Sequence, residues 1–378
     1  MAGWWEALER RAGLRAKAGL TRTLRPRGID DPVVDLAGND YLGLARHPAV
    51  VAAATEALTG YGLGATGSRL VRGSTDAHTA LETALADWLG AQQALVYSSG
   101  YLANLGAVRA LVGPRTLLVS DAHNHASLID GCRLSGAETV VVPHADVAAF
   151  GAALAAAPGR PAVVVTESVY SVDGDLAPLA ALHRVVRDAG ALLLVDDAHA
   201  IGVLGQDGAG AVAAAGLAGA PDVVVTATLS KALGGAGGVV AGPAALIRHL
   251  VDTGRTFIYD TAPPPAVVAG VHAALRVARS ADDLRGVLRE RARTVVRRLR
   301  AAGLTVSDPA AGIISVTAPG PEAAVAWAAD CRDRGTAVGC FRPPSTPDGT
   351  SRLRLTLNAG VPADDFDRAL DVIVECAP

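Results

Sequence analysis

One lysine in this 378-residue chain is placed as a chemically active residue would be. Lysine occurs only at positions 17 and 231, although Lys and Arg together number 34, so arginine fills almost every other cationic position. Lys231 lies between the strand-like run 222–226 and the glycine-rich segment 234–238. Unlike arginine, a lysine can lose its proton and attack a carbonyl group. We therefore treat Lys231 as a candidate nucleophile, with an ordinary surface lysine as the alternative.

A second reactive pattern ends the apolar run 191–195, where Asp196, Asp197 and His199 follow in close succession. A carboxylate buried at the end of such a run needs a cation or a hydrogen-bond donor to stay charged. A pyridinium nitrogen suits Asp196, because a carboxylate beside that nitrogen keeps it protonated. The alternative is an aspartate that only caps the next helix.

Small and polar residues follow other apolar runs. Segment 98–104 opens a helix with Ser, Ser and Gly, whose free amides can bind an anion, although the same pattern fits an ordinary turn. In segment 121–127, His123 and His125 could suggest metal binding, but no third ligand lies nearby in sequence. An imidazole there can instead stack on a flat cofactor. Structural capping by the flanking Asp or Ser is the alternative.

The remaining candidates are two hydroxyl groups and one arginine. Ser171 follows the run 162–166 and so belongs to the same sheet edge, while Thr228 offers a hydroxyl group to a phosphate beside Lys231. Arg342 offers the planar guanidinium that clamps a carboxylate with two hydrogen bonds. Most arginines of this chain are expected to be exposed to solvent. The position of Arg342 in the sequence is therefore only weak evidence that it binds a substrate.

The apolar runs predict the scaffold that must position these residues. Continuous apolar strands that alternate with helical segments indicate a mostly parallel sheet covered on both faces. Seven such strands predict an open α/β sheet whose site lies beyond the carboxyl ends of the strands. The predicted strands are 94–97, 116–119, 139–142, 162–166, 191–195, 223–226 and 238–241.

The flanking regions complete the expected architecture. Before the sheet we expect an amphipathic helix over 4–20, a strand over 33–36 and helices over 48–59 and 75–90. After it we expect an α+β subdomain with a long helix over 264–302, a helix over 321–334 and strands over 312–316 and 353–357. The predicted regions are an N-terminal helix and arm (1–45), a large domain with the candidate site (46–263) and a smaller C-terminal α+β subdomain (264–378).

Composition excludes several classes of function. The formal net charge is −3, and aromatic residues make up 4%, so neither nucleic acid nor an anionic membrane is an expected partner. No apolar run is long enough to span a bilayer. Four widely spaced cysteines indicate reduced thiols in a cytoplasmic protein, with no metal site. We do not expect a secretory signal in residues 1–27, which lack a continuous apolar core, and Glu6 and Glu9 argue against a transit peptide.

Segment 62–67, Gly-Leu-Gly-Ala-Thr-Gly, matches the glycine spacing of dinucleotide-binding sites. That motif requires a strand before it, whereas a helical segment precedes it here, so we interpret it as a flexible loop. A dinucleotide-binding oxidoreductase therefore stays only as a distant alternative. A non-enzymatic scaffold is a third possibility, but it leaves the polar clusters at five strand ends unexplained.

Taken in order, these motifs resemble those of the fold-type I pyridoxal-phosphate enzymes, and more closely their α-oxoamine synthase branch. The shared segments are Ser98-Ser-Gly-Tyr101, His125-Ala-Ser127, Glu167–Gly174, Asp196-Asp-Ala-His199 and Thr228-Leu-Ser-Lys231. The markers of the branch are Asn39-Asp-Tyr-Leu-Gly-Leu44, Arg342-Pro-Pro and Arg352–Leu357, so the resemblance covers nearly the whole chain.

The resemblance implies a role for each cofactor-binding residue. Pyridoxal 5′-phosphate would be held covalently by Lys231 and paired at its ring nitrogen with Asp196. The other implied cofactor contacts are His125 stacked on the ring, Ser171 and His199 at the ring's phenolic oxygen, and Gly100, Tyr101 and Thr228 at the phosphate. The implied catalytic residues are Lys231, His125, Asp196 and His199.

The resemblance also implies substrates and an assembly. Arg342 would take the carboxylate of an amino acid, while Asn39, His125 and Ser345 would line the substrate site. An N-terminal basic residue often meets the acyl substrate in this branch, and Arg22 is our substitute because Thr21 stands at the aligned position. The site would lie at the interface of a homodimer, with the 64–74 loop a candidate to act across it.

The implied reaction is a decarboxylative condensation of L-alanine with a pimeloyl thioester, carried by coenzyme A or an acyl carrier protein, in biotin biosynthesis. Another member of the branch, such as a glycine C-acetyltransferase, is the nearest alternative. The choice of alanine or glycine and the choice of acyl carrier are left open by the sequence.

Overall fold

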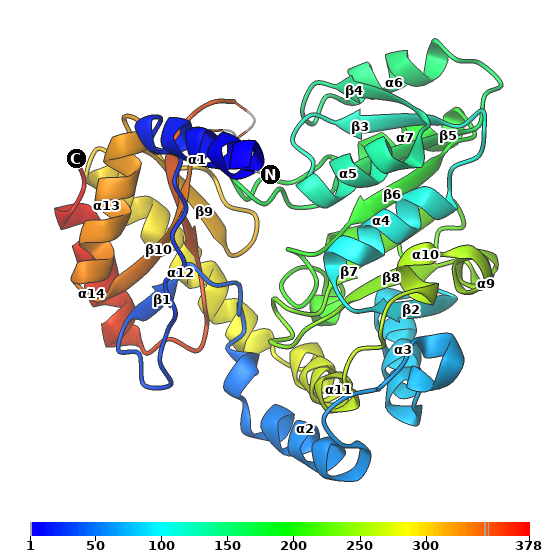
Figure 1. Cartoon of the computed structure of the whole chain (residues 1–378), viewed down its shortest axis with the longest axis horizontal. Helices are drawn as coiled ribbons and strands as arrows, with labels where there is room; N and C mark the ends of the chain where they lie inside the picture. Colours follow the sequence, from blue (N-terminus) through cyan, green and yellow to red (C-terminus); the bar gives the residue numbers. More distant parts are fainter. Residues whose placement is uncertain (1, 344, 347) are drawn as a thin grey trace.

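The computed structural model describes residues 2–343, 345–346 and 348–378. Two sheets, each covered by helices, form the two halves of the molecule in Figure 1. Over the described part of the chain, none of the helices is long and apolar enough to cross a membrane.

Seven strands form the larger sheet, in the spatial order β2-β8-β7-β6-β5-β3-β4. Only β8 runs antiparallel to its neighbours, and the other pairs are parallel. The predicted mostly parallel seven-stranded sheet is therefore confirmed. Its strands are β2 (Gln93–Tyr97), β3 (Leu117–Asp121), β4 (Glu138–Val142), β5 (Ala162–Glu167), β6 (Leu192–Asp196), β7 (Val223–Thr228) and β8 (Gly238–Gly242).

These strands read as continuous apolar runs because helices bury both faces of the sheet. In β3, Leu117 and Val119 belong to one core, and Leu118, which points to the opposite face, belongs to the other. One face is covered by α4 (Gly100–Ala110), α5 (Ala126–Ser135), α9 (Ala244–Thr253) and α10 (Arg255–Ile258). The other is covered by α3 (Asp76–Leu89), α6 (Val147–Ala155), α7 (Leu179–Asp188), α8 (Ala211–Ala214) and α11 (Pro265–Arg279).

The smaller sheet joins the two ends of the chain. Its order is β1 (Val34–Leu36), β10 (Thr336–Phe341), β11 (Arg352–Thr356) and β9 (Ile313–Thr317), with β1 parallel to β10 and the other pairs antiparallel. Helices α12 (Asp282–Ala301), α13 (Pro321–Asp333) and α14 (Ala363–Glu375) contribute its core. The sequence analysis did not identify β10 or α14. The division into regions 1–45, 46–263 and 264–378 stays a prediction.

The single long helix predicted over 264–302 was wrong, because α11 ends at Arg279 and α12 begins at Asp282. Arg285 stabilises the break: its buried guanidinium donates to the carbonyl oxygen of Ala278 at 2.6 Å and to Oδ1 of Asp282 at 2.8 Å. Basic residues end α11 and acidic residues begin α12, and each placement suits the dipole of its own helix.

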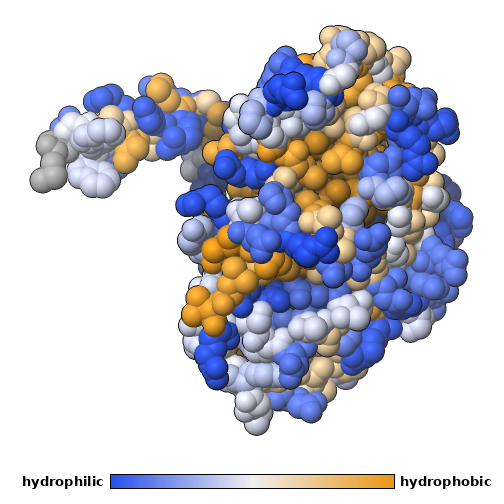
Figure 2. All heavy atoms as spheres, turned by 90° about the vertical axis from the view of Figure 1, so that its right-hand side faces the viewer, coloured by the Kyte–Doolittle hydropathy of each residue, from blue (hydrophilic) through white to orange (hydrophobic). Residues whose placement is uncertain are grey.

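The first two helices of the chain lie outside both sheets. Helix α1 (Ala2–Lys17) exposes its apolar residues, including Trp4 at 78% and Leu14 at 67%, and projects from the body as the narrow arm on the left of Figure 2. Helix α2 (Pro48–Tyr61) packs against α11 (Figure 1). The segment predicted as a loop contains one π-helical turn, Arg69–Gly73, and short 3-10 turns lie at Leu44–Arg46 and Gln206–Gly208.

Candidate active site

Three polar residues lie side by side at the carboxyl ends of the parallel strands. Glu167 of β5 is in register with Asp196 of β6, and Asp196 is in register with Thr226 of β7. All three are buried. The predicted position of Asp196 at this edge of the sheet is therefore observed, and a carboxylate of the neighbouring strand stands next to it.

Asp196 is fixed by donors on both of its oxygens. The amide of Ala198 donates to Oδ1 at 3.0 Å, and the side chain of Asn104 donates to Oδ2 at 2.7 Å. Thr226 donates to the other end of the Asn104 amide at 2.5 Å, which sets the orientation of that amide. Two donors from different parts of the chain hold this carboxylate in one orientation.

Lys231 follows β7 and lies against His199. Its Nζ atom is 2.8 Å from Nε2 of His199. Burial lowers the pKa of Lys231, Asp196 and Glu167 oppose this effect, and the net result is a pKa of about 8. Burial, together with the charges of Lys231 and Arg354, holds the pKa of His199 well below its ordinary value. The pair therefore consists of a neutral imidazole and an amine that loses its proton near pH 8.

His125 caps the N-terminus of α5 and shares a hydrogen-bond network with Asp196. Its Nδ1 accepts from the amide of Ser127 at 3.2 Å and lies 2.7 Å from the Ser127 hydroxyl group, to which Asn104 donates at 2.8 Å. Burial lowers the pKa of His125, and the charge of Asp196 opposes this. Through Asn104 and Ser127, the positions of His125 and Asp196 are linked.

His123 does not join this cluster. Its ring stacks on His144, with centroids 3.9 Å apart and an interplanar angle of 11°. His144 lies between Asp121 at 3.0 Å and Asp175 at 2.9 Å. Burial lowers the pKa of His144, but these two carboxylates outweigh it and raise the pKa to about 9. His123 and His144 thus belong to a separate charged cluster next to the site.

The N-terminus of α4 lies directly against Thr228. A Cβ added to Gly100 would be 3.0 Å from Cβ of Thr228, so glycine allows this close approach without displacing the threonine. The first amides of a helix have no carbonyl partner within it and attract anions. The Tyr101 hydroxyl group donates to Asp130 at 2.6 Å, so only the backbone of this residue is left for a role in anion binding. The structure therefore places Gly100 against Thr228, and phosphate binding by Gly100, Tyr101 and Thr228 stays a prediction.

Three predicted substrate residues, Arg22, Arg342 and Ser345, line one groove of about 870 Å³ beneath the N-terminal arm. Arg22 donates to the Ser345 hydroxyl group at 3.4 Å. Arg342 donates to the carbonyl oxygens of Gly19 and of Thr21, the latter at 3.0 Å. Within the described residues, no hydrogen bond or ion pair joins Arg342 to Lys231, so its guanidinium is engaged with the arm in this structure.

Arg354 is a functional candidate that the sequence analysis missed. It is buried, its guanidinium lies 4.6 Å above the ring of Phe341, and it donates to the backbone oxygen of Ser171 at 3.0 Å and to Oδ1 of Asn39 at 3.3 Å. Ser171 and Asn39 are thus joined through one cation. The signal was present in the alternating Arg-Leu-Arg-Leu of β11, which places two arginines on one face of the strand.

Tyr41, Asn104 and Glu167 were also missed as site residues. The Tyr41 hydroxyl group is 2.6 Å from Nδ1 of His199. Oε1 of Glu167 is buried and has no hydrogen-bond partner among the described residues, and burial and the charge of Asp196 raise the pKa of Glu167. All three lie within motifs that the sequence analysis identified, but a single sequence does not show which residues of these motifs contact each other.

Comparison with known proteins places this geometry in a family. The model of the family described as aminotransferase class I and II matches residues 31–373. The 8-amino-7-oxononanoate synthase of Mycolicibacterium gilvum is 53% identical, covering 96% of this chain and 94% of the relative. That of Mycobacterium tuberculosis is 51% identical, covering 98% of this chain and 94% of the relative.

The chain belongs to the class I and II aminotransferase family and, within it, to the 8-amino-7-oxononanoate synthases. The predicted fold-type I architecture is therefore confirmed. The segment 62–67 follows helix α2, so the strand that a dinucleotide site requires is absent before it.

Solved structures show how widely this synthase fold is shared. Serine palmitoyltransferase from S. paucimobilis, solved with a PLP–myriocin aldimine, superposes with a TM-score of 0.92 at 30% identity, covering 100% of this chain and 98% of that one. The 8-amino-7-oxononanoate synthase of Francisella tularensis superposes with a TM-score of 0.78 at 27% identity, covering 92% and 98%. Overall shape thus does not separate members of the family that use different substrates.

Proposed function

We propose that this chain condenses L-alanine with a pimeloyl thioester, releasing CO₂ and the thiol carrier and giving 8-amino-7-oxononanoate for biotin biosynthesis. The observation that carries the proposal is the meeting of Lys231, Asp196, His125 and His199 at one edge of the large sheet. The substrate assignment rests on relatives of more than 50% identity named for this activity.

The residues at the sheet edge fit pyridoxal 5′-phosphate. The N-terminus of α4 against Thr228 is a built anion site, with Gly100 leaving the room that a Cβ would fill. The fixed carboxylate of Asp196 suits a pyridinium nitrogen, and the amine of Lys231 suits an aldehyde. His125 provides a flat ring next to Asp196 and Lys231, and His199 provides a polar ring nitrogen. When bound, the cofactor supplies an electron sink for the bonds at the amino-acid Cα.

Within this proposal, the residues of the chain hold the cofactor and move protons. Lys231 would anchor the cofactor until the incoming alanine frees its amine. The pKa of Lys231 is about 8, so a fraction of the freed amine is neutral at physiological pH. This neutral amine would accept the proton from Cα of alanine. Asp196 keeps the ring nitrogen protonated. His125 would cover the ring. His199 and Ser171, whose backbone oxygen accepts from Arg354, would hold the phenolic oxygen.

The cationic groove beneath the N-terminal arm is the proposed binding surface for anionic substrate groups. Its lining includes Arg15, Arg22, Arg25, Arg332 and Arg342. For Arg342 to clamp the alanine carboxylate, that carboxylate must replace the backbone oxygens of Gly19 and Thr21 as acceptors. Asn39 and Ser345 complete the proposed substrate contacts.

The reaction is tested with purified, cofactor-loaded chain. Addition of L-alanine should change the visible spectrum, and pimeloyl thioesters of coenzyme A and of acyl carrier protein should then give 8-amino-7-oxononanoate by mass spectrometry. Glycine with acetyl-coenzyme A and serine with palmitoyl-coenzyme A are the matched alternatives, the second because of the structural likeness to serine palmitoyltransferase. Higher kcat/KM for either alternative would overturn the assignment.

The cofactor site is tested separately from the substrates. Borohydride reduction of the loaded chain followed by peptide mapping should place a pyridoxyl group on Lys231. Lys17 serves as the internal control, because lysine occurs only at these two positions. Modification of Lys17 alone, or of neither lysine, would contradict the proposed site.

The proposal includes a homodimer and a cytoplasmic, reducing setting. Apolar side chains of the 61–74 segment are exposed in the single chain, with Leu63 at 85% and Val71 at 84%. Figure 2 shows hydrophobic residues gathered in a hollow of one face of the molecule. The four cysteines are unpaired. Light scattering coupled to gel filtration checks the dimer, and a monomer at micromolar concentration would contradict it.

A further inference from the structure

His199 lies between two partners that come from distant parts of the chain. Its Nε2 is 2.8 Å from Nζ of Lys231, and its Nδ1 is 2.6 Å from the hydroxyl oxygen of Tyr41. Tyr41 precedes His199 by 158 positions and belongs to the segment that follows β1. The two rings meet edge to face, with centroids 6.2 Å apart.

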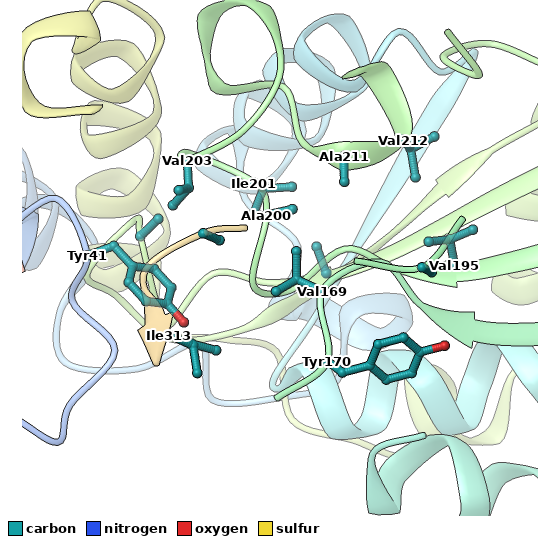
Figure 3. Close-up of a cluster of buried hydrophobic side chains, with 14 of the residues drawn as sticks. Tyr41, Val169, Tyr170, Val195, Ala200, Ile201, Val203, Ala211, Val212 and Ile313 are labelled. Atoms are coloured by element: carbon teal, nitrogen blue, oxygen red, sulfur yellow. The ribbon is translucent and has the colours of Figure 1, made fainter. Parts of the chain in front are cut away.

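Tyr41 is held in a single position. It is completely buried, and its backbone oxygen accepts from the amide of Ala359 at 2.7 Å. A Cβ at Gly312 would lie 2.7 Å from the ring, so the ring fits only because that residue is glycine. Figure 3 shows the ring beside Ile313 of the small sheet and near the Ala200–Val203 turn of the large one. The hydroxyl group therefore has little freedom to seek another partner.

The hydrogen bonds around His199 determine which of its two ring nitrogens carries the hydrogen. Burial raises the pKa of Tyr41, so its hydroxyl group stays protonated and must donate. Its one hydrogen-bond partner among the described residues is Nδ1 of His199. A neutral imidazole that accepts at Nδ1 carries its hydrogen on Nε2. That hydrogen then points at Nζ of Lys231, which can accept it only as an unprotonated amine.

We propose that Tyr41 is a positioning residue that keeps the proton of His199 on Nε2 and thereby favours the neutral amine of Lys231. The opposite arrangement, in which a lysine ammonium donates to Nε2, requires a hydrogen on Nδ1 and leaves the buried Tyr41 hydroxyl hydrogen without an acceptor. An unmade buried hydrogen bond disfavours that arrangement. The catalytic meaning of this inference rests on the proposed function, but the proton positions do not.

Other charged groups also face this pair, and Tyr41 acts in addition to them. Asp196 and Glu167, at the ends of β6 and β5, favour the ammonium form of Lys231, whereas Arg354 of β11 opposes it. Arg354 and His125 also oppose protonation of His199. Replacing the Tyr41 hydroxyl group leaves all four of these groups in place, so its effect can be measured alone.

The first test reads the tautomer directly. Full-length chain freed of cofactor by dialysis against hydroxylamine is labelled with ¹⁵N-histidine, and His199 is assigned by its disappearance in His199→Gln. At pH 7 the wild-type signals should report a hydrogen on Nε2 and a hydrogen-bonded, unprotonated Nδ1. A hydrogen on Nδ1 in the wild type would overturn the proposal, and this result does not depend on any variant's folding.

The second test reads the amine. Trace acetylation of the cofactor-free chain at a series of pH values is followed at Lys231 by mass spectrometry, with the exposed Lys17 as the internal reference. In Tyr41→Phe, the midpoint for Lys231 should rise by about half to one pH unit, since one neutral hydrogen bond is lost. An unchanged midpoint for Lys231 would contradict the proposal.

Tyr97→Phe is the matched control. Tyr97 is also buried, and its hydroxyl group has no hydrogen-bond partner among the described residues and no contact with His199. It should leave both the tautomer and the Lys231 midpoint as in the wild type. A shift of equal size in Tyr97→Phe would assign the effect to general loosening of the core. Neither measurement requires turnover, so failure of the proposed reaction and failure of this inference remain distinguishable.

Discussion

Asn104 donates to Oδ2 of Asp196 at 2.7 Å, and Thr226 fixes the same amide from its other end at 2.5 Å. Asn104→Ala removes this donor from a buried carboxylate. Hydrogen bonds to charged groups contribute about 1.5–3 kcal/mol, so we expect the dissociation constant for pyridoxal 5′-phosphate to rise roughly ten- to hundredfold. Fluorescence titration of the cofactor-free chain measures it.

The control for this prediction is Asn124→Ala. Asn124 is buried to a similar degree and donates to Ser120 and to the carbonyl oxygen of Val165. It also accepts from the backbone amide of Glu167 at 3.1 Å, but it makes no hydrogen bond to Asp196. It should lower thermal stability and leave cofactor affinity close to that of the wild type. Equal losses of affinity in the two variants would show that Asn104 acts only through stability.

Gly238 sets how closely β8 approaches the N-terminus of α4. A Cβ there would be 2.4 Å from the backbone oxygen of Ser99 and 2.6 Å from Cα of Gly100, and backbone atoms cannot give way. Gly238→Ala should displace the amides that face Thr228 and weaken phosphate binding at least tenfold. Gly242→Ala, at the other end of β8, meets no atom closer than 3.7 Å and should bind phosphate normally. Similar phosphate affinities in both variants would refute the anion site.

The amine of Lys231 predicts one window of pH-dependent stability. Its pKa falls from 10.5 in the unfolded chain to about 8 in the folded chain. Between these values the unfolded chain holds a proton that the folded chain has released, so the free energy of unfolding rises with pH. In Lys231→Met the free energy of unfolding should not rise with pH in this range. At pH 7.5 this variant should be more stable than the wild type, by about 3 kcal/mol at most. Urea unfolding of cofactor-free chain at pH 7.5 and 10 checks it; a constant difference between the proteins would contradict it.

His144 predicts a second window of opposite sign. Its pKa is raised from 6.5 to about 9 in the folded chain because Asp121 and Asp175 outweigh the effect of burial. Protonated His144 stabilises the folded chain. This contribution is fully present below pH 6.5 and is lost as the pH rises through 9. His144→Gln should remove up to about 3 kcal/mol at pH 6 and little at pH 9.5. The exposed His249, changed to Gln, should leave the profile unaltered, and a pH-independent loss in His144→Gln would count against the ion pairs.

Arg285 is expected to hold the break between α11 and α12. Arg285→Ala leaves the carbonyl oxygen of Ala278 without its side-chain donor and should lower the free energy of unfolding by about 2 kcal/mol. Arg289→Ala, on the exposed side of the same helix, should change it by less than about 0.5 kcal/mol. Denaturant titration of both variants measures the difference. Equal effects would mean that the break does not depend on Arg285.

The large sheet was predictable because its central strands, such as β5, β6 and β7, are buried on both faces. Runs such as 191–195 and 223–225 are apolar at every position, and polar residues follow where these strands end. That rule placed Asp196, Lys231 and Thr228 at one edge without any knowledge of contacts. α14 offered a comparable signal that was overlooked, since Phe366, Ala369, Leu370 and Ile373 follow helical spacing.

The rest depended on contacts that no local pattern encodes. β10 has only intermediate burial after its first residue and contains Gly339, so it lacks the apolar run of a buried strand. The break after Arg279 is set by Arg285 from the following helix. The pairing of Tyr41 with His199 spans 158 positions. The predicted clamp, Arg342, binds backbone oxygens of the arm, and sequence gave no sign of that competition.

The parallel pairing of β1 with β10 has a consequence for synthesis of the chain. The register places Val34 opposite Thr336, so the first strand to leave the ribosome has no partner until some 300 further residues have been made. All strands of the large sheet lie between Gln93 and Gly242 and can pair in the meantime. The earliest strand is therefore among the last to be paired, and Tyr41, a few residues beyond it, reaches its final place only as the nascent chain nears completion.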